Sequence, residues 1–234
     1  GVALGRVLFG EAEPGGKLPL SIPYRTDDLP AFEEYSMSNR TYRFSERHMY
    51  PFGFGLRYGS VSLHDAHLEC LPVEGETLPR LAGPGASDSH GGDREETATL
   101  LLPAAWFAYR GGAARNSGEL PAFLRDPGTL RLVFAAENQG RRAVTETFQL
   151  YARYPEVAGA PRSQLCGFQR ATISGEGRGV VAVDISIKAL MLVDKKGIRY
   201  LPEETLELYL GTSSPGGESL GAAKPEVLRF RLGR

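Results

Sequence analysis

The chain has 234 residues, of which 41% are hydrophobic and 24% are charged, so it holds enough apolar surface to build a core and is not a disordered chain. Twenty-seven basic and 28 acidic side chains leave a formal net charge of −1. This balance lacks the long-range positive field that recruits nucleic acid or anionic membrane, and the apolar runs fall short of the roughly 20 residues that span a bilayer. We therefore expect neither nucleic acid nor a membrane as a partner.

The first residues predict the end of a helix. Residues 2–9 carry the broad apolar stripe of a short amphipathic helix, which ends before Gly10 and the Pro14–Gly16 cluster. From residue 18 to 23, leucine and isoleucine alternate with proline and serine, which predicts a short edge strand. Because the sequence has no initiator methionine and no basic leader before an apolar core, we interpret Gly1 as an interior cut.

Residues 24–59 show little periodicity but many aromatic side chains, and predict an irregular segment that must pack on another surface. If the run from Arg40 to Phe44 is extended, alternation puts Arg40 and Tyr42 on one face and Arg43 on the other. Arginine beside aromatic rings either binds a sugar or fastens a loop to a domain, and the second use is the commoner one. Arg40, Tyr42 and Arg43 are therefore our candidates for substrate binding or domain docking.

Strand patterns begin at Ser60 and are interrupted twice. Residues 61–68 open a strand, and residues 82–94 contain no hydrophobe larger than alanine, which predicts a mobile loop. Residues 97–127 fit either a strand hairpin or local padding.

The last hundred residues alternate more clearly. Several short strands separated by turns indicate a β-sandwich of the immunoglobulin or fibronectin type III kind. We expect the strands at 130–136 and 144–154 to pair as an antiparallel hairpin around the turn at residues 138–140. The predicted strands are 130–136, 144–154, 163–173, 179–187 and 205–211.

No constellation of catalytic or ligating residues stands out. On a strand, His64 and His67 would face opposite sides, and His48 has no neighbours of ligand type, so we expect no metal. Cys70 and Cys166 could form one disulfide at most, and two reduced thiols are the simpler interpretation. Phosphate-loop, dinucleotide and nucleophile-elbow motifs are absent, and we expect no cofactor. Acidic residues of the amino-terminal part lie in polar stretches, where solvated carboxylates are the default: Glu11, Glu13, Asp27, Asp28, Glu33, Glu34 and Glu46.

Three motifs in order resemble glycoside hydrolase family 3. Residues 1–23 (GVALGRVLFGEAEPGGKLPLSIP) are similar to the end of that family's α/β sandwich domain. Residues 33–44 (EEYSMSNRTYRF) and 49–59 (MYPFGFGLRYG) resemble its D-Y-S-M-K-G-R-T-Y-R-Y and L-Y-P-F-G-Y-G-L-S-Y segments, with Asn39 in place of a frequent glycine, a swap that a left-handed turn tolerates. The family's fibronectin type III-like domain is matched by ENQGRRAVTETFQLYARYPEV, SQLCGFQR and ETLELYLGTSS.

The resemblance implies a mainly β fold: a fibronectin type III-like β-sandwich preceded by the last helix and strand of an α/β sandwich domain. Residues 1–23 would end the α/β domain, residues 24–59 would connect, and residues 60–234 would form the β-sandwich. Between Tyr58 and Thr129 the chain is far longer than the family's usual strand and turn, so we expect an insertion at about 71–128.

The R-T-Y-R form is most like β-xylosidase-type members, and implies a retaining glycosidase that releases terminal non-reducing β-D-xylosyl or β-D-glucosyl residues. In the family the nucleophile is a barrel aspartate and the acid/base is a glutamate of the α/β domain, both upstream of Gly1. We therefore expect no catalytic residue here, a chain inactive alone, and partners in the upstream catalytic domains of the same polypeptide, where the intact enzyme binds its oligosaccharide.

Two alternatives remain open. A carbohydrate-binding module would hold sugar on exposed aromatic rings of the sandwich, for which Tyr151, Tyr154 and Phe168 are the candidates. A purely structural, adhesion-like domain would leave the amino-terminal helix without a purpose. The sequence decides neither the sugar nor the compartment.

Overall fold

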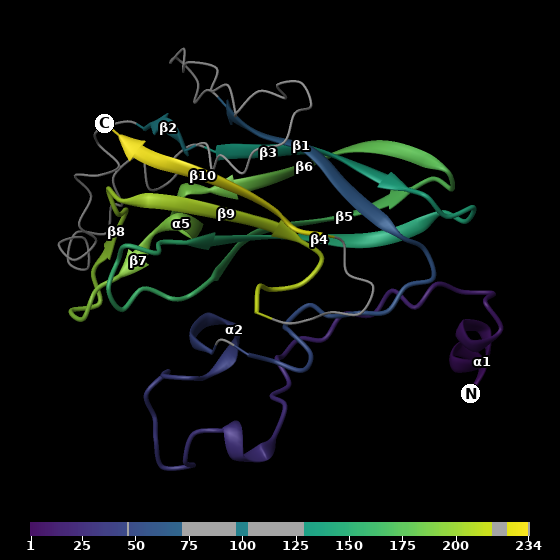
Figure 1. The fold of residues 1–234 in the computed structure, drawn as a ribbon, viewed down its shortest axis with the longest axis horizontal. Coiled ribbons are helices and arrows are strands. Elements are labelled where there is room, and N and C mark those ends of the chain that lie inside the picture. Colours follow the sequence, from purple (N-terminus) through teal and green to yellow (C-terminus); the bar gives the residue numbers. More distant parts are fainter. Residues whose placement is uncertain (46, 72–96, 103–128, 217–223, 234) are drawn as a thin grey trace, which may run out of the picture.

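The computed structural model describes residues 1–45, 47–71, 97–102, 129–216 and 224–233. Figure 1 shows a β-sandwich with the amino-terminal residues 1–59 extending below it. The three-stranded sheet has the order β1 (Val61–Leu71), β3 (Thr129–Asn138), β6 (Gly177–Ser186). The five-stranded sheet has the order β2 (Thr97–Leu101), β10 (Glu226–Gly233), β9 (Thr205–Gly211), β4 (Val144–Arg153), β5 (Gln164–Ile173).

Every strand pair of the two sheets is antiparallel except β2 with β10, which is parallel. A helical turn, α5 (Ile187–Leu190), and a two-stranded ribbon of β7 (Leu192–Val193) and β8 (Arg199–Tyr200) complete the sandwich. The predicted mainly β sandwich is confirmed. The loop expected at residues 82–94 lies outside the described residues.

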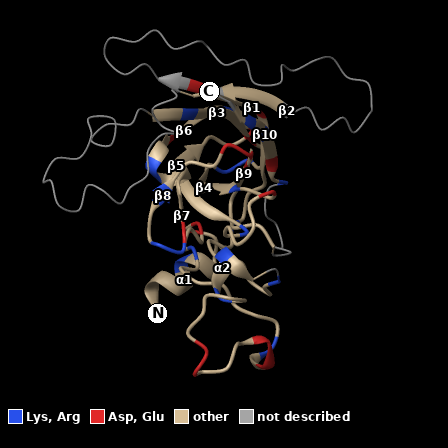
Figure 2. Cartoon of the chain, turned by 90° about the vertical axis from the view of Figure 1, so that its left-hand side faces the viewer, with Lys and Arg blue, Asp and Glu red and all other residues tan. Residues whose placement is uncertain are grey.

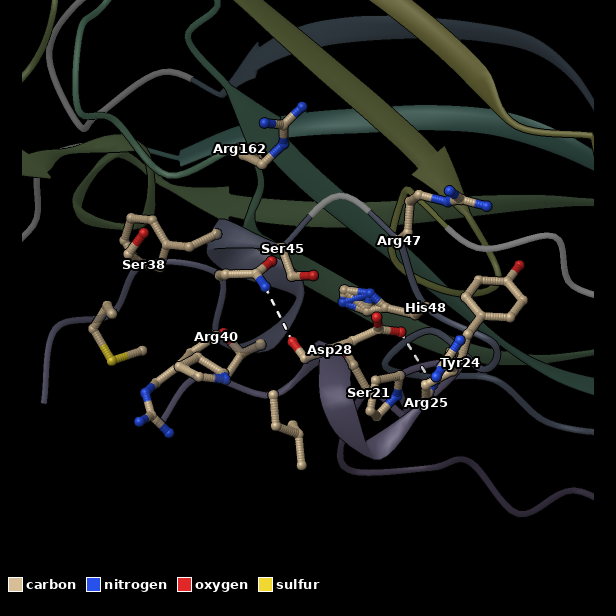
Figure 3. A pocket seen from close by; sticks show the side chains of 17 residues that line it. Ser21, Tyr24, Arg25, Asp28, Ser38, Arg40, Ser45, Arg47, His48 and Arg162 are labelled. Carbon is tan, nitrogen blue, oxygen red and sulfur yellow. Dashed lines mark hydrogen bonds between the residues drawn. The ribbon is translucent and has the colours of Figure 1, made fainter. Parts of the chain in front are cut away.

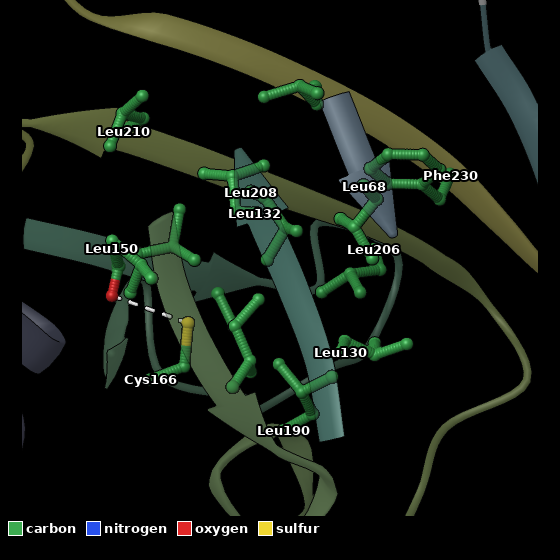
Figure 4. Close-up of a cluster of buried hydrophobic side chains, with 14 of the residues drawn as sticks. Leu68, Leu130, Leu132, Leu150, Cys166, Leu190, Leu206, Leu208, Leu210 and Phe230 are labelled. Atoms are coloured by element: carbon green, nitrogen blue, oxygen red, sulfur yellow. Dashed lines mark hydrogen bonds between the residues drawn. The ribbon is translucent and has the colours of Figure 1, made fainter. Parts of the chain in front are cut away.

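The two sheets enclose one apolar core (Figure 4). On β9, residues 206, 208 and 210 are all leucine and completely buried, which is the alternation of a strand with one face in the core. Cys166 lies in the same core as a free thiol; its Sγ donates to the Leu150 carbonyl at 3.3 Å, and burial raises the pKa of the thiol to about 12. The thiol is therefore protonated and unreactive at neutral pH.

The expected hairpin of the strands at 130–136 and 144–154 is wrong in its pairing. Both strands form, but β3 belongs to the three-stranded sheet and β4 to the five-stranded sheet. Between them the chain passes from one sheet to the other. Asn138, 1% exposed, stabilises this crossing because its Nδ2 donates to the carbonyls of Arg142 at 2.7 Å and Ser174 at 3.0 Å. The rings of Phe134 and Phe148 then meet edge to face across the core, with centroids 5.1 Å apart.

The expectation that His64 and His67 face opposite sides of their strand is wrong, because β1 contains a bulge between them. The register against β3 shifts between His64 and His67, where Asp65 has φ of 57°. Since Leu63 and Leu68 on either side are both buried, the inserted residue turns His64 and His67 to the same, outer face. Each ring has its own partners, Ser62 and Glu137 for the first and Asp65 and Glu69 for the second. In the described part of the chain no three His, Cys, Asp or Glu side chains form a metal-binding group.

The amino-terminal elements agree with the sequence only in part. Helix α1 (Val2–Leu8) forms as predicted. The strand expected at 18–23 is reduced to a single bridge between Ile22 and Tyr50, because its prolines cannot donate. Beyond a turn of 3₁₀ helix, η1 (Thr26–Asp28), the run expected to be extended forms the helical turn α2 (Thr41–Phe44) instead. Asn39 has φ of 53°, the left-handed conformation expected at a position where glycine is frequent.

Candidate functional site

The face of the sandwich that carries β4 and β9 is covered by residues of the amino-terminal segment 1–59. Gly53 approaches it most closely: its φ is 79°, and a Cβ added there would lie 2.2 Å from Oε1 of Gln149. The Gln149 amide donates from Nε2 to the carbonyls of Gly53 at 3.4 Å and Thr212 at 3.0 Å. A glycine is required here both by the backbone and by the space.

Two aromatic side chains complete this contact. The Tyr151 hydroxyl donates to Oε1 of Gln149 at 2.5 Å, and burial raises the pKa of Tyr151 well above its usual value, so the donor stays protonated. The ring of Tyr42 lies 5.5 Å from that of Tyr151 and 4.8 Å from that of Phe52. Rings in tilted or edge-to-face contact at these distances stabilise by about 0.5–1.5 kcal/mol per pair beyond their buried area.

A buried charged cluster links the same two parts of the chain. Glu146 of β4 is 3% exposed, and each of its oxygens meets one cation. Lys17 Nζ lies 2.5 Å from Oε1, and Arg57 Nη1 lies 2.5 Å from Oε2. The Lys17 ammonium also donates to the Thr212 carbonyl at 3.2 Å. With both oxygens paired, the carboxylate is fully compensated, and removal of either kind of partner leaves a buried charge.

Tyr42 and Arg43, two of the candidates from the sequence, contact the sandwich. The Tyr42 carbonyl accepts from Ser163 Oγ at 3.0 Å, and the Arg43 carbonyl accepts from the Arg162 amide at 2.7 Å. The Arg43 guanidinium donates from Nη2 to Oε1 of Gln164 at 3.1 Å. These contacts fasten the turn α2 to β5 and to the loop before it.

Arg40, the third candidate, is separated from them and lines an open pocket with a cavity volume of about 970 Å³ (Figure 3). Its Nη2 donates to the carbonyls of Ala31 at 3.2 Å and of Glu34. Its Nε is buried and has no hydrogen-bond partner among the described residues. The structure thus divides the predicted trio into two residues that contact the sandwich and one that faces a cavity.

His48 lies on the floor of this pocket and is 2% exposed. Its backbone amide donates to the Gly216 carbonyl at 3.3 Å, while its Nδ1 has no partner in the part of the chain that the structure describes. Burial lowers the pKa of the imidazole, so the ring is neutral at physiological pH. Ser21 also lines the pocket, and its buried Oγ likewise has no hydrogen-bond partner among the described residues.

Several functional features were missed by the sequence analysis. Glu146 alternates in phase with the apolar Val144 and Phe148 of β4, which is a signal that could have identified it, since a buried acid requires a cation. His48 and Ser21 carry no comparable signal. For the carbohydrate-binding alternative, Tyr151 and Tyr154 are buried in the sandwich, and only Phe168 among the three candidate rings is largely exposed.

Comparisons with known proteins agree with the two-part architecture. A model described as the glycosyl hydrolase family 3 C-terminal domain matches residues 1–58, and a model of a fibronectin type III-like domain matches residues 146–214. A xylan 1,4-beta-xylosidase of Xylanibacter ruminicola is 42% identical over 69 residues, which is 30% of this chain and 8% of that protein. A beta-xylosidase/alpha-L-arabinofuranosidase of Medicago sativa is 23% identical over 222 residues, 90% of this chain and 25% of that protein.

Solved structures show the same fold. The beta-D-glucoside glucohydrolase of Trichoderma reesei matches 98% of this chain with a TM-score of 0.61 at 18% identity. A family 3 beta-glucosidase of Bifidobacterium adolescentis matches 99% with a TM-score of 0.62 at 19% identity. In each case the match covers 28% of the other chain. The present chain therefore spans about a quarter of these proteins, and less of the Xylanibacter relative.

Proposed function

Since the chain is a carboxy-terminal part of a glycoside hydrolase family 3 enzyme of the β-xylosidase/β-glucosidase type, we propose that it is the non-catalytic brace of a retaining glycosidase. The intact enzyme hydrolyses terminal non-reducing β-D-xylosyl or β-D-glucosyl residues. This part holds the catalytic domains in place and contains neither the nucleophile nor the acid/base.

The observation that carries the proposal is that segment 1–59 has two different sides. On one side the segment is tied to the sandwich through the buried Glu146 cluster and through Gly53 against Gln149. On the other side it presents large apolar side chains to solvent, a liability in an isolated domain. The most exposed of them are Val2, Phe9, Phe32 and Tyr35, each more than 80% exposed.

Helix α1 supports the same view because it cannot be stable alone. It has seven residues, none of them buried, and isolated helices shorter than about 12 residues are marginal in water. Tyr58 donates to the Val7 carbonyl and Arg142 to the Gly10 carbonyl, so the end of the helix is positioned while its apolar stripe is left open. A covering surface supplied by the rest of the polypeptide fits this arrangement.

Glu34 and Asp27, two described acids of the segment, do not have the environment that a general acid of glycoside hydrolysis requires. A general acid needs a raised pKa, and a retaining pair holds two carboxyl groups about 5–5.5 Å apart. Hydrogen bonds from Ser36 hold the pKa of Glu34 below its ordinary value. Asp27 is paired with Arg25 at 2.9 Å on the surface. The lowered pKa of Glu34 favours its ionised form, which suits a solvated surface group rather than a proton donor.

The test is hydrolysis of chromogenic β-xyloside and β-glucoside by the 234-residue chain, measured beside a polypeptide extended upstream through the catalytic domains. Activity in the extended polypeptide alone is expected, and the preferred substrate identifies the sugar. Turnover by the 234-residue chain would contradict the proposal. Equal stability of the extended polypeptide with and without residues 60–234 would contradict the bracing role.

A further inference from the structure

The lining of the pocket beside Arg40 contains more basic than acidic side chains. Arg25, Arg40, Arg47 and Arg162 line it together with Asp28, and Arg25 is paired with Asp27 at 2.9 Å. Figure 2 shows basic and acidic residues interspersed along the described chain, including the part of the chain around η1.

Two of these arginines, Arg40 and Arg47, form no ion pair with a described acid, although Arg40 lies near enough to Glu34 to help lower the pKa of its carboxyl group. Arg40 donates only to the carbonyls of Ala31 and Glu34. The Arg47 guanidinium lies over the ring of Tyr24, 5.6 Å from its centroid. Figure 3 places these two arginines on opposite sides of His48. A carboxylate near either guanidinium would form a charge-assisted hydrogen bond, about twice as strong as a neutral one.

The floor of the pocket adds groups that still require hydrogen bonds. Nδ1 of His48 and Oγ of Ser21 are buried without partners among the described residues. A buried polar atom left unpaired is destabilising, so a site of this kind is completed by a polar group from outside. Because the His48 ring is neutral, it adds no charge that would compete with the arginines for a carboxylate.

The rim favours a protein surface over a free small molecule. Phe32 and Tyr35, on the loop that Arg40 clamps, are 87% and 86% exposed, and Leu29 at the pocket edge is 56% exposed. Exposed large apolar side chains mark protein-interaction sites, and aromatic residues and arginine are enriched in protein interfaces.

We propose that this pocket receives an acidic segment of the catalytic part of the same polypeptide, with its carboxylates on Arg40 and Arg47 and its other polar groups on His48 and Ser21. The inference rests on the proposed function, because it takes the upstream domains as the partner. It adds the chemistry of the contact: the partner surface is acidic at this point and apolar around it.

Hydrogen–deuterium exchange of residues 21–45 tests the contact in the polypeptide extended upstream. Exchange there should be at least tenfold slower than in the 234-residue chain. The charge reversal Arg47→Glu should remove most of this protection, and the neutral Arg47→Met should remove less of it. In the 234-residue chain, where the acidic segment is missing, the two variants should exchange alike. Arg199→Glu, a reversal at an exposed strand residue outside the pocket, is the control and should change nothing in residues 21–45.

A second measurement identifies the partner group. A carbodiimide joins an amine to a carboxylate in contact with it, so the Arg47→Lys variant of the extended polypeptide should yield a cross-link between position 47 and an aspartate or glutamate upstream of Gly1. Coupling to Asp28 alone, or equal exchange of residues 21–45 in the Arg47→Glu and Arg47→Met variants of the extended polypeptide, would overturn the inference.

Failure of the inference and failure of the proposed function are distinguishable. Neither readout depends on turnover. If residues 2–9 of α1 are protected in the extended polypeptide and residues 21–45 are not, the brace stands and the pocket contact is wrong. If neither region is protected, the bracing role itself fails.

Discussion

The sandwich and the amino-terminal segment are stabilised in different ways. In the sandwich, leucine, valine and phenylalanine of both sheets fill one core, and a side chain such as Leu208 is completely buried. In segment 1–59 the described residues classed as buried are His48, Pro51 and Gly53. The first region is stabilised by burial of apolar area, whereas the second is held by a few specific contacts to its neighbour. It follows that the segment can be released without unfolding the sandwich, and that the reverse is not possible.

Phe148→Ala should have the largest effect because it removes a fully buried ring that meets Phe134 across the two sheets. We expect a loss of about 3–5 kcal/mol in the free energy of unfolding. Chemical denaturation followed by fluorescence measures it. Both regions should unfold together; a segment that stays protected from exchange after the sandwich has unfolded would contradict the dependence described above.

Glu146→Gln should separate the two regions. It removes the carboxylate charge that Lys17 and Arg57 both contact, and breaking a buried pair in this way costs about 3 kcal/mol. Because both cations belong to the segment, the loss should appear as faster hydrogen exchange and proteolysis within residues 1–59. Exchange in β9 should stay slow. Equal acceleration in both regions would show that the cluster supports the sandwich itself.

Gly53→Ala should loosen the same contact more locally. A methyl group there meets the Gln149 amide, and φ of 79° is strained for alanine. We expect a cost of about 1–3 kcal/mol to docking. Gly197→Ala, also at positive φ but with no atom within 4 Å of the added Cβ, is the matched control that contains the backbone strain without the clash. Comparison of proteolysis rates separates the two contributions, and equal rates would show that close approach to Gln149 is unimportant.

Asp184→Asn should have the smallest effect. This carboxylate is paired with Arg131 at 2.6 Å on the outer face of the three-stranded sheet, and the arginine holds its pKa below the usual value. An exposed pair of this kind contributes about 0.2–1 kcal/mol. Since the folded pKa is lowered, the contribution is present above the unfolded pKa of the carboxyl group and is lost as the pH falls through the folded pKa. Melting temperatures of the two proteins should converge in acid; a difference that persists there would exclude the ion pair as its cause.

The same contrast explains which parts of the fold were predictable. Strand positions follow from alternation, and the predicted spans at 163–173 and 205–211 match β5 and β9 closely. Pairing did not follow, because alternation does not say which sheet a strand joins, and the crossing between β3 and β4 depends on the buried amide of Asn138.

For the segment, alternation was the wrong signal. Residues 40–44 read as extended but form the turn α2, since the contacts of Tyr42 and Arg43 with β5 and its preceding loop override local preference. The role of Arg40, Tyr42 and Arg43 in substrate binding or domain docking stays a prediction. Tyr42 and Arg43 contact the sandwich whereas Arg40 lines a pocket, and this separation is a tertiary property that the sequence does not encode locally. His48 and Ser21 became visible only when their burial was known.

The most direct test of the bracing role is the thermal inactivation of the enzyme extended upstream, with and without Glu146→Gln. The variant should lose β-xyloside or β-glucoside hydrolysis several-fold faster on heating, while KM and kcat at low temperature stay unchanged, because Glu146 holds the brace and touches no substrate. A changed KM together with an unchanged inactivation rate would contradict the bracing role.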